Sequence, residues 1–353
     1  MARIHSREAK LEERRKQTVS EQVPFVINGE MDFVDKKIEN GGLETLELAK
    51  PIGEMMTNST TRKEFMRKVV LDVELGKEQV PTLYQPIYER IQDSNFPKEF
   101  EAKWAQYGSV IFFEHIEGEE VKFGSLQAEQ GPIAYIKGYT AGFEYTKEIQ
   151  MFNQTFNLEL LNRAFGEAHN ALKNHLHFAP IIKHSYKAAN KTAAVYVNEL
   201  GKTLDNSDGA HMTLSTRATL RKALSDTRTA KRPGTVLLAS EADREQIEEG
   251  MASLTIQATP YRGVDGITDV IYYDGWEASV GKKSYQYPGV AQGKCYLIRP
   301  KRGFKELIKQ ELQINSTIGD LTRLVEAQVV GDFWRGVFAA VDENIQEITL
   351  PGE

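Results

Sequence analysis

The chain has 353 residues, of which 41% are hydrophobic and 27% charged, and its formal net charge is -6. That length suffices for two or three domains, or for one core with large extensions. Its longest apolar runs span about four residues, far fewer than the roughly 20 of a membrane-spanning helix, and no signal peptide opens the chain. The acidic balance argues against a protein whose main task is to grip nucleic acid with a basic surface.

The N-terminal region is poor in apolar residues. Residues 1–16 hold six basic and three acidic side chains, which favours a solvated arm over a charged surface helix. Residues 17–60 mix turn residues with short apolar pieces, so they predict an extended arm with brief helices, one of them at 43–50. If such an arm is ordered, we expect it to lie on its own body or on a neighbouring subunit.

A long β-hairpin is predicted further along the chain. Residues 110–116 and 121–123 are apolar and predict strands, and residues 124–132 form a polar turn. Residues 133–145 then place apolar or aromatic side chains at every second position except Lys137, which predicts a strand with one apolar face. At about 3.3 Å per residue this strand extends about 43 Å, so we expect something outside the domain to cover it.

Almost without a loop, the pattern after this strand changes to helical spacing. Two apolar stripes run as far as His177, so this helix is expected to be buried on more than one side. Pro180 is expected to end the helix, because proline lacks the backbone N–H that a continuing helix needs.

Residues 212–300 predict a compact α/β module. Its single cysteine, Cys295, lies in an apolar strand pattern, so we expect a small core residue. The elements expected are a helix at 215–229, a strand at 235–239, a helix opened by the capping box Ser240–Asp243 and ended by Gly250, and strands at 270–273, 276–280 and 293–299.

The C-terminal part predicts one helix and one long strand. The helix is expected at 304–312. Residues 325–341 place apolar side chains on odd positions, which predicts another over-long strand, with Gly331 and Gly336 allowing a bulge or bend.

Patterns that would indicate catalysis are weak. Gly201-Lys202-Thr203 matches the end of a phosphate-binding loop, but Tyr196 stands where that pattern needs a glycine. The histidines at 169, 175, 177 and 184 lack the spacing of a zinc helix, so surface or capping roles are favoured. Neither a nucleophile elbow nor a dinucleotide fingerprint is present. We therefore predict no enzyme, no catalytic residue, no cofactor and no metal site.

The most basic stretch lies at 217–232, where six basic side chains accompany one acidic residue, Asp226. A solvated helix face or a subunit contact is the favoured interpretation, and contact with phosphate is the alternative. The basic residues are Arg217, Arg221, Lys222, Arg228, Lys231 and Arg232.

Taken in order, these elements resemble the major capsid protein of tailed bacteriophages, which has the Hong Kong type capsid fold. The resemblance covers roughly residues 60–350 and depends on the order and spacing of elements. It is carried by the segments Gly142–Ile149, Thr235–Ser240, Tyr273–Gly275, Gly289–Val290, Gly293–Pro300 and Glu326–Gly331.

The resemblance implies an α+β fold with six parts. These are an N-terminal arm at 1–60, a first peripheral part at 61–109, an extended hairpin loop at 110–147, a peripheral part with a spine helix at 148–211, an axial domain at 212–300, and a closing peripheral helix and long strand at 301–353.

The same resemblance implies a structural protein that assembles into an icosahedral shell around double-stranded DNA. Its partners would be further copies of itself in hexamers and pentamers, a separate scaffolding protein, a portal, and weakly held packaged DNA, with a decoration protein left open. No membrane is involved. The protein would reside in the virion after assembly in the host cytoplasm, without proteolytic maturation.

Seven residues are candidate inter-subunit contacts. Tyr135, Tyr139 and Phe143 lie on the apolar face of the long strand, so Tyr139→Asp is expected to spare the fold and impair assembly. Some relatives of the family crosslink a hairpin lysine, and Lys122 and Lys137 are candidates for contacts by position only. The remaining two candidates are Arg221 and Arg228 in the basic stretch.

Two other functions stay open. An encapsulin-like nanocompartment shares the fold but encloses enzymes, and particles that contain DNA and a portal would distinguish the phage coat from it. A nucleic-acid-binding protein would use the basic stretch 217–232. Charge reversal at Arg221 and Arg228 would separate these functions, because it would abolish either DNA binding or particle formation.

Overall fold

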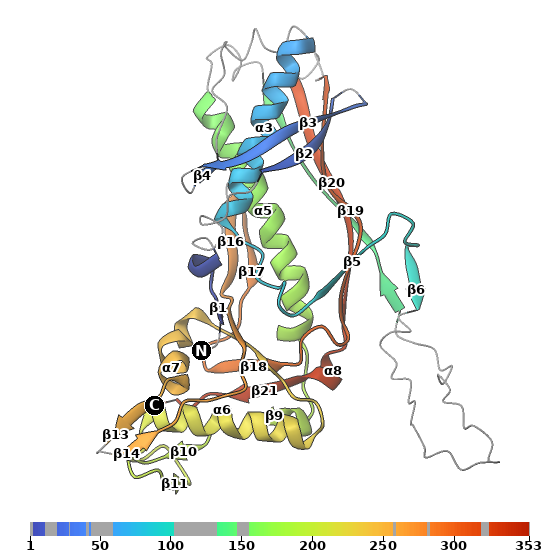
Figure 1. The fold of residues 1–353 in the computed structure, drawn as a ribbon. Coiled ribbons are helices and arrows are strands. Elements are labelled where there is room, and N and C mark those ends of the chain that lie inside the picture. The colour runs from blue at the N-terminus through green and yellow to red at the C-terminus, as the bar shows by residue number, and fades with distance from the viewer. Residues whose placement is uncertain are drawn as a thin grey trace, which may run out of the picture.

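The computed structural model describes residues 3–10, 20–27, 29–39, 42–43, 59–101, 133–146, 155–256, 259–280, 283–318 and 325–352. These residues form an elongated molecule with one large sheet and two long helices at one end and a smaller sheet at the other (Figure 1). The α+β class expected from the sequence is therefore confirmed. We call the two parts the seven-stranded module and the six-stranded module.

The six-stranded module is built on a mixed sheet that is buried on both faces. Its helices are α6 (Met212–Thr229) and α7 (Arg244–Met251), which lie on one face. In spatial order its strands are β1 (Arg3–His5), β15 (Asp269–Tyr272), β12 (Val236–Ala239), β18 (Lys294–Ile298), β21 (Ile345–Thr349) and β9 (Lys191–Thr192).

Alternate residues of the central strands enter two different cores. In β12, Leu237 and Ala239 face α6 and α7, whereas Val236 and Leu238 face the end of a long helix, α5 (Thr155–Ile182). A strand covered on both faces needs apolar residues at every position, which is why its sequence is continuously apolar. Cys295 is fully buried in the same sheet, as predicted, and burial raises the pKa of its thiol.

The seven-stranded module is an extended sheet with long strands. The predicted strands at 133–145 and 325–341 are both present. The path of the sheet runs β4 (Gly42–Leu43), β3 (Glu30–Glu39), β2 (Ser20–Ile27), β19 (Phe304–Ile318), β20 (Val325–Ala339) and β8 (Lys137–Thr146), and β5 (Glu89–Gln92) also pairs with β19.

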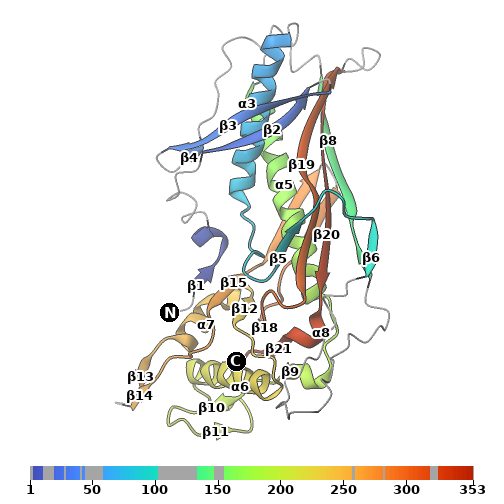
Figure 2. The same ribbon diagram turned by 45° about the vertical axis from the view of Figure 1, so that its right-hand side comes forward.

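Two helices, α3 (Ser59–Gln79) and α5 (Thr155–Ile182), lie together on one side of this sheet (Figure 2). They approach closely because glycines stand at the contact: a Cβ on Gly166 would lie 2.0 Å from the carbonyl oxygen of Val73, and one on Gly76 would lie 2.0 Å from that of Arg163. The prediction that Pro180 ends α5 was wrong. The helix continues to Ile182, because proline removes only one donor there and Lys183 N–H still bonds the Ala179 carbonyl at 3.0 Å.

The prediction of a helix at 304–312 was also wrong, since these residues begin the strand β19. Register shifts between Ile308 and Gln310, and between Gln310 and Gln313, mark β-bulges against β20. Each bulge changes which residues face the core. The apolar spacing therefore departs from strict alternation and imitates a helix, and the bulges lie on β19, not at the glycines of β20.

The N-terminal arm is more regular than the sequence predicted. β1 pairs in parallel with β15, where Ile4 packs against the core of the six-stranded module. β2 and β3 form a hairpin that joins the large sheet through β19. The described residues of the arm lie on the body of their own chain, which is one of the two arrangements expected for an ordered arm. The interpretation as a solvated arm does not hold for residues 3–10.

The remaining elements are short pairs and turns. The predicted segments 110–132, most of 43–50 and the start of the long helix before residue 155 lie outside the described residues, and Lys122 is among them. The short elements are β6 (Glu99–Glu101) with β7 (Ile133–Tyr135), β10 (Tyr196–Val197) with β11 (Thr203–Leu204), β13 (Leu254–Ile256) with β14 (Thr259–Tyr261), β16 (Gly275–Val280) with β17 (Lys283–Pro288), η2 (Ala188–Asn190), η3 (Glu241–Asp243) and α8 (Val341–Asn344).

Candidate assembly surface

The side of the large sheet that faces away from α3 and α5 carries a row of aligned residues. Strand pairing places Met31 opposite Val26, Val26 opposite Asn315, Asn315 opposite Val330, and Val330 opposite Gly142. Paired residues on neighbouring strands point to the same face of a sheet. One continuous row therefore crosses five strands on the outward side.

This outward side exposes large apolar side chains. Met31 is 61% exposed, Phe33 47%, Val330 43% and Trp334 42%. We call these four residues the outer sheet face. Trp334 lies across a glycine, since a Cβ on Gly138 would be 3.0 Å from the indole ring. Apolar groups gathered on one face in this way commonly mark a protein contact.

The strand next to this face is an open edge. Among the described residues, β8 pairs only with β20 along its ten residues and ends the sheet. An unpaired strand of this length presents free N–H and C=O groups to another chain. No proline interrupts it, and its outward positions include Gly138, Thr140 and Gly142, which leave the backbone accessible.

The sequence-predicted contacts on β8 have different surroundings. Tyr139 stacks on Phe333 with ring centroids 5.2 Å apart, and burial raises its pKa. Phe143 packs edge-on against Phe165 of α5 at 5.6 Å. The apolar face of this strand is thus covered largely by its own chain. Tyr139→Asp would disturb that packing, so it does not separate assembly from folding.

Two other predicted contacts lie at the surface. Tyr135 is 48% exposed, and Lys137 is exposed at the start of β8. Both lie beside the open edge. They stay proposed inter-subunit contacts, as do the other five candidates from the sequence.

Half of the outer sheet face could have been found from the sequence. The apolar residues at odd positions of 325–341 predict a strand with one apolar face. Val330 and Trp334 are large apolar residues at even positions, and they indicate a second apolar face. A strand that is apolar on both faces is either covered on both of them or exposes one apolar face. The hairpin residues Met31 and Phe33 gave no such signal, because the strand to which they belong was not predicted.

The basic stretch, which lies on α6 and the three residues after it, divides into two groups. Arg217 is buried, and its Nε donates to the Gly250 carbonyl at 3.1 Å, while Arg232 donates to the Asp342 carbonyl at 3.1 Å and to that of Ala189 at 3.1 Å. These two side chains hold the fold together. The candidates Arg221 and Arg228 remain exposed on the helix.

The histidines serve as packing and hydrogen-bonding groups. His177 is fully buried and stacks on Tyr84 with centroids 3.5 Å apart, and His184 Nε2 lies 2.8 Å from the Asp342 carboxylate. Burial lowers the pKa of both His169 and His177, which favours their neutral forms. Within the described residues, no three potential ligands converge as a metal site would require. None of the described helices is long and apolar enough to cross a membrane.

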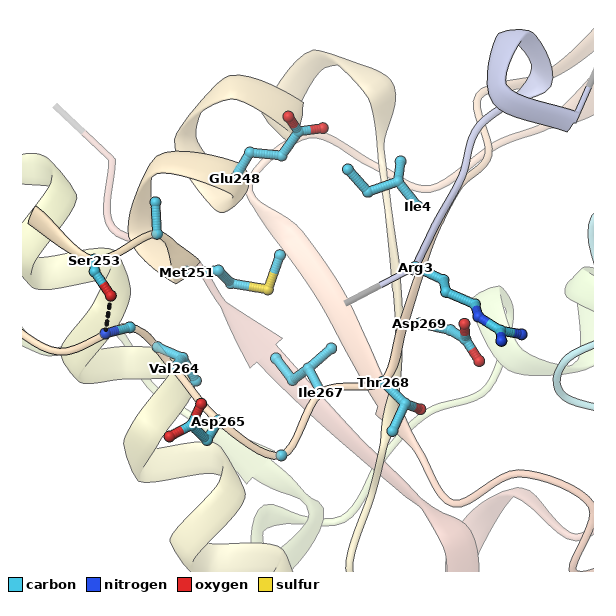
Figure 3. A pocket seen from close by; sticks show the side chains of 13 residues that line it. Arg3, Ile4, Glu248, Met251, Ser253, Val264, Asp265, Ile267, Thr268 and Asp269 are labelled. Atoms are coloured by element: carbon cyan, nitrogen blue, oxygen red, sulfur yellow. Dashed lines mark hydrogen bonds between the residues drawn. The ribbon is translucent and has the colours of Figure 1, made fainter. Parts of the chain in front are cut away.

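A hollow of about 1030 Å³ lies beside β1, between α7 and residues 263–269 (Figure 3). Ile4, Met251 and Ile267 contribute apolar side chains to it. Its acidic groups already have partners: Glu248 accepts from Arg244 at 2.7 Å, and Asp269 lies 2.9 Å from His5. The hollow is therefore a gap beside a short edge strand, without a set of free polar groups that would bind a ligand.

Comparison with known proteins returns shell-forming structures. No protein-family model matches the sequence, and no curated protein matches it. Among solved structures, the mature capsid of bacteriophage PhiM1 is similar, with 9% identity, a TM-score of 0.48 and coverage of 77% of this chain and 88% of that one.

Two further solved structures are also similar. One is the virus-like particle from Pyrococcus furiosus, with 10% identity, a TM-score of 0.48 and coverage of 81% and 99% of the two chains. The other is an encapsulin complex from Synechococcus elongatus, with 10% identity, a TM-score of 0.43 and coverage of 76% and 90%.

Proposed function

We propose that the protein is the major capsid protein of a tailed phage and assembles into an icosahedral shell around double-stranded DNA. The observation that carries this proposal is the combination of the outer sheet face with the open edge of β8. A lone soluble domain protects such an edge with charges, proline or a covering loop. Here, within the described part of the chain, Val330 and Trp334 stand beside it and are 43% and 42% exposed.

The chemistry of these surfaces fits contact with further copies of the same chain. An apolar sheet face on one copy and a different element on the next make a heterologous contact, which closes into rings when the rotation allows. Hexamers and pentamers are such rings. In this proposal the six-stranded module takes the axial position, and the seven-stranded module with α5 as its spine takes the peripheral one.

The other partners belong to the same proposal. A separate scaffolding protein would guide assembly, a portal would admit DNA, and the shell would reside in the virion after assembly in the host cytoplasm. The residue ranges assigned to the arm, the hairpin loop and the two domains are retained as proposed boundaries. Three strands of the small sheet, at 3–5, 191–192 and 345–349, nevertheless come from outside the range 212–300.

Substitution on the outer sheet face tests the proposal. Val330→Asp places a charge on the outward side of β20, where it lies opposite Gly142 and displaces no core residue. We expect its thermal unfolding midpoint to stay within about 1 °C of the original, which corresponds to less than about 1 kcal/mol for a chain of this length. Electron microscopy and sedimentation should show free subunits where the original chain forms shells.

Leu200→Asp is a matched control. Leu200 is 78% exposed in the six-stranded module, far from the outer sheet face, so the same change of chemistry should leave assembly intact. Shells formed by Val330→Asp at the original yield would refute the role of this face. The content of the particles separates the coat from a nanocompartment: double-stranded DNA supports the phage coat, and enclosed enzymes without DNA support the encapsulin-like alternative.

A further inference from the structure

A second hollow, of about 360 Å³, lies between α6 and the segment 262–265. Three arginines line it, Arg221 and Arg228 from α6 and Arg262 from the facing segment, together with the side chain of Ser225 and one acid, Asp265. Three guanidinium groups against one carboxylate leave a local charge of about +2 in a chain whose net charge is negative.

The contacts of these arginines show which donors remain available. Arg221 uses Nη2 to donate to the carbonyl oxygen of Arg262 at 2.5 Å and to that of Gly263 at 3.3 Å, which fixes its position and leaves its other N–H groups. Arg262 pairs with Asp265 at 2.7 Å at the solvent-exposed rim.

Arg228 lies against the backbone at Gly266, where a Cβ would be 2.9 Å from its Nη2. It makes no ion pair and no side-chain hydrogen bond with any residue in the described part of the chain. The guanidinium N–H groups of Arg228 are therefore available to a ligand in the hollow.

The structural arginines of the same basic stretch provide a contrast. Arg217 and Arg232 each donate to two backbone carbonyl oxygens, and Arg217 is buried. These two arginines are thus bound to carbonyls, as Arg221 is through its Nη2 alone. Arg228 has no such partner, so its position is not explained by the packing of α6.

We propose that Arg221, Arg228 and Arg262 form an anion site that binds a phosphate group, with the Ser225 hydroxyl as a further donor. Several guanidinium forks converging from two elements match the tetrahedral oxygens of phosphate, to which they donate paired, charge-assisted hydrogen bonds. The phosphate comes either from a nucleic-acid backbone or from solution. Only the first source rests on the proposed shell function, in which packaged DNA supplies it.

Binding of a 20-base-pair DNA duplex to the unassembled full chain tests the first source. Fluorescence anisotropy should show Arg228→Gln weakening the affinity by about 3- to 10-fold and lowering the slope of log K against log salt by about one. Lys222→Gln is the matched control, because Lys222 lies on the same helix and carries the same charge but does not line the hollow. It should have less than half of the effect on affinity.

Inorganic phosphate tests the second source. At equal ionic strength, phosphate instead of chloride should raise the thermal unfolding midpoint of the original chain and of Lys222→Gln, and this rise should be absent in Arg228→Gln. A phosphate effect without duplex binding assigns the site to free phosphate.

Three results would overturn the anion site. Equal losses in Arg228→Gln and Lys222→Gln would indicate a diffuse basic surface. Absence of both duplex binding and the phosphate effect would exclude phosphate. Unchanged phosphate binding with failed assembly in Arg228→Gln would identify a carboxylate of a neighbouring copy as the partner. If the original chain binds phosphate but never forms particles, the shell function fails and the anion site stands.

Discussion

The two modules of this protein hold themselves together in different ways. The six-stranded sheet is sandwiched between two apolar cores, and each of the four residues of β12 is buried. The seven-stranded module also has an apolar core, but charged side chains that pair with one another lie inside it, among them Lys68, Asp72 and Glu74. The buried Arg217 and Asp243 of the six-stranded module bind backbone groups instead. Apolar burial is strong and non-directional, whereas a buried charge requires a specific partner in a specific place.

The charged groups of the seven-stranded module connect its helices to its sheet. Arg335 of β20 is 1% exposed and pairs with Glu306, and its Nη2 donates to Glu311 at 2.8 Å. Tyr84 donates its hydroxyl to Glu306 at 2.7 Å and stacks on His177 of α5. Any movement of α5 along the sheet would separate these groups. The ion pairs of the sheet therefore reach the long helix through Tyr84 and its stack on His177.

The largest effect is expected when one partner of this network is removed. Arg335→Met leaves the buried Glu306 without its cation, which should lower the free energy of unfolding by about 3–5 kcal/mol. Urea denaturation measures the loss. The double variant Arg335→Met with Glu306→Met should regain most of it, because neither charge then remains buried. A cost below about 1 kcal/mol for Arg335→Met would show that the network contributes little.

Removal of apolar volume from the other module should come next. Leu237 is fully buried in β12, and Leu237→Ala should cost about 3 kcal/mol through lost burial and the cavity left behind. Because no titratable group is lost, this difference from the original chain should be the same at pH 7 and pH 4. Urea unfolding at both pH values checks it, and a cost that changes with pH would remove the distinction between the modules.

Acid should weaken the seven-stranded module through Glu74. Burial raises the pKa of this carboxyl, but the nearby ammonium groups of Lys77 and Lys36 lower the pKa by a larger amount. The pKa therefore falls from 4.5 to about 2. A lowered folded-state pKa means that the stabilisation is present above pH 4.5 and is lost as the pH falls toward 2. The loss should amount to about 2–3 kcal/mol.

Glu74→Gln tests this pH dependence, because an amide cannot titrate. Its free energy of unfolding, measured between pH 5 and pH 2, should fall less steeply with acid than that of the original chain. Parallel curves for the two proteins would assign the acid sensitivity to other carboxyl groups.

The smallest effect is expected for an ion pair in the six-stranded module whose lysine is half exposed. Lys294 of β18 is half exposed and lies 3.3 Å from Glu347, which also has Lys191 at 3.4 Å. Lys294→Gln should cost less than about 1 kcal/mol, since solvent screens the pair and a second lysine remains. Thermal unfolding measures this cost. A loss of stability comparable to that of Arg335→Met would mean that the exposure of an ion pair does not determine how much it stabilises the fold.

The sequence predicted the two modules with unequal success, for the same physical reason. The small module has a continuous apolar strand at 236–239 and a capping serine, Ser240, whose hydroxyl accepts from Ala242 N–H at 3.2 Å, and both signals are local. The helix α3 was not recognised, because buried polar residues such as Lys68 and Asp72 interrupt its apolar stripe. Their partners lie far away in the chain, where no local pattern can indicate them.

The candidate site shows the same limit. The strand at 133–145 was predicted well, but its apolar side, with Tyr139 and Phe143, proved to be covered mainly by α5 and β20. The exposed side depends on which strands pair in which register, and the sequence contains no direct signal for that. Of the basic stretch, exposure at Arg221 and Arg228 could be expected, whereas the burial of Arg217 could not.

The pairing of the N-terminal strands also sets the order in which the chain can fold. β1 pairs with β15, and β2 pairs with β19, which begins at Phe304. On a ribosome these early strands leave the exit tunnel long before their partners are made. Contacts between segments so distant in the sequence form slowly. Completion of both sheets is therefore a late event, and until then the edges of β15 and β19 are accessible to other chains.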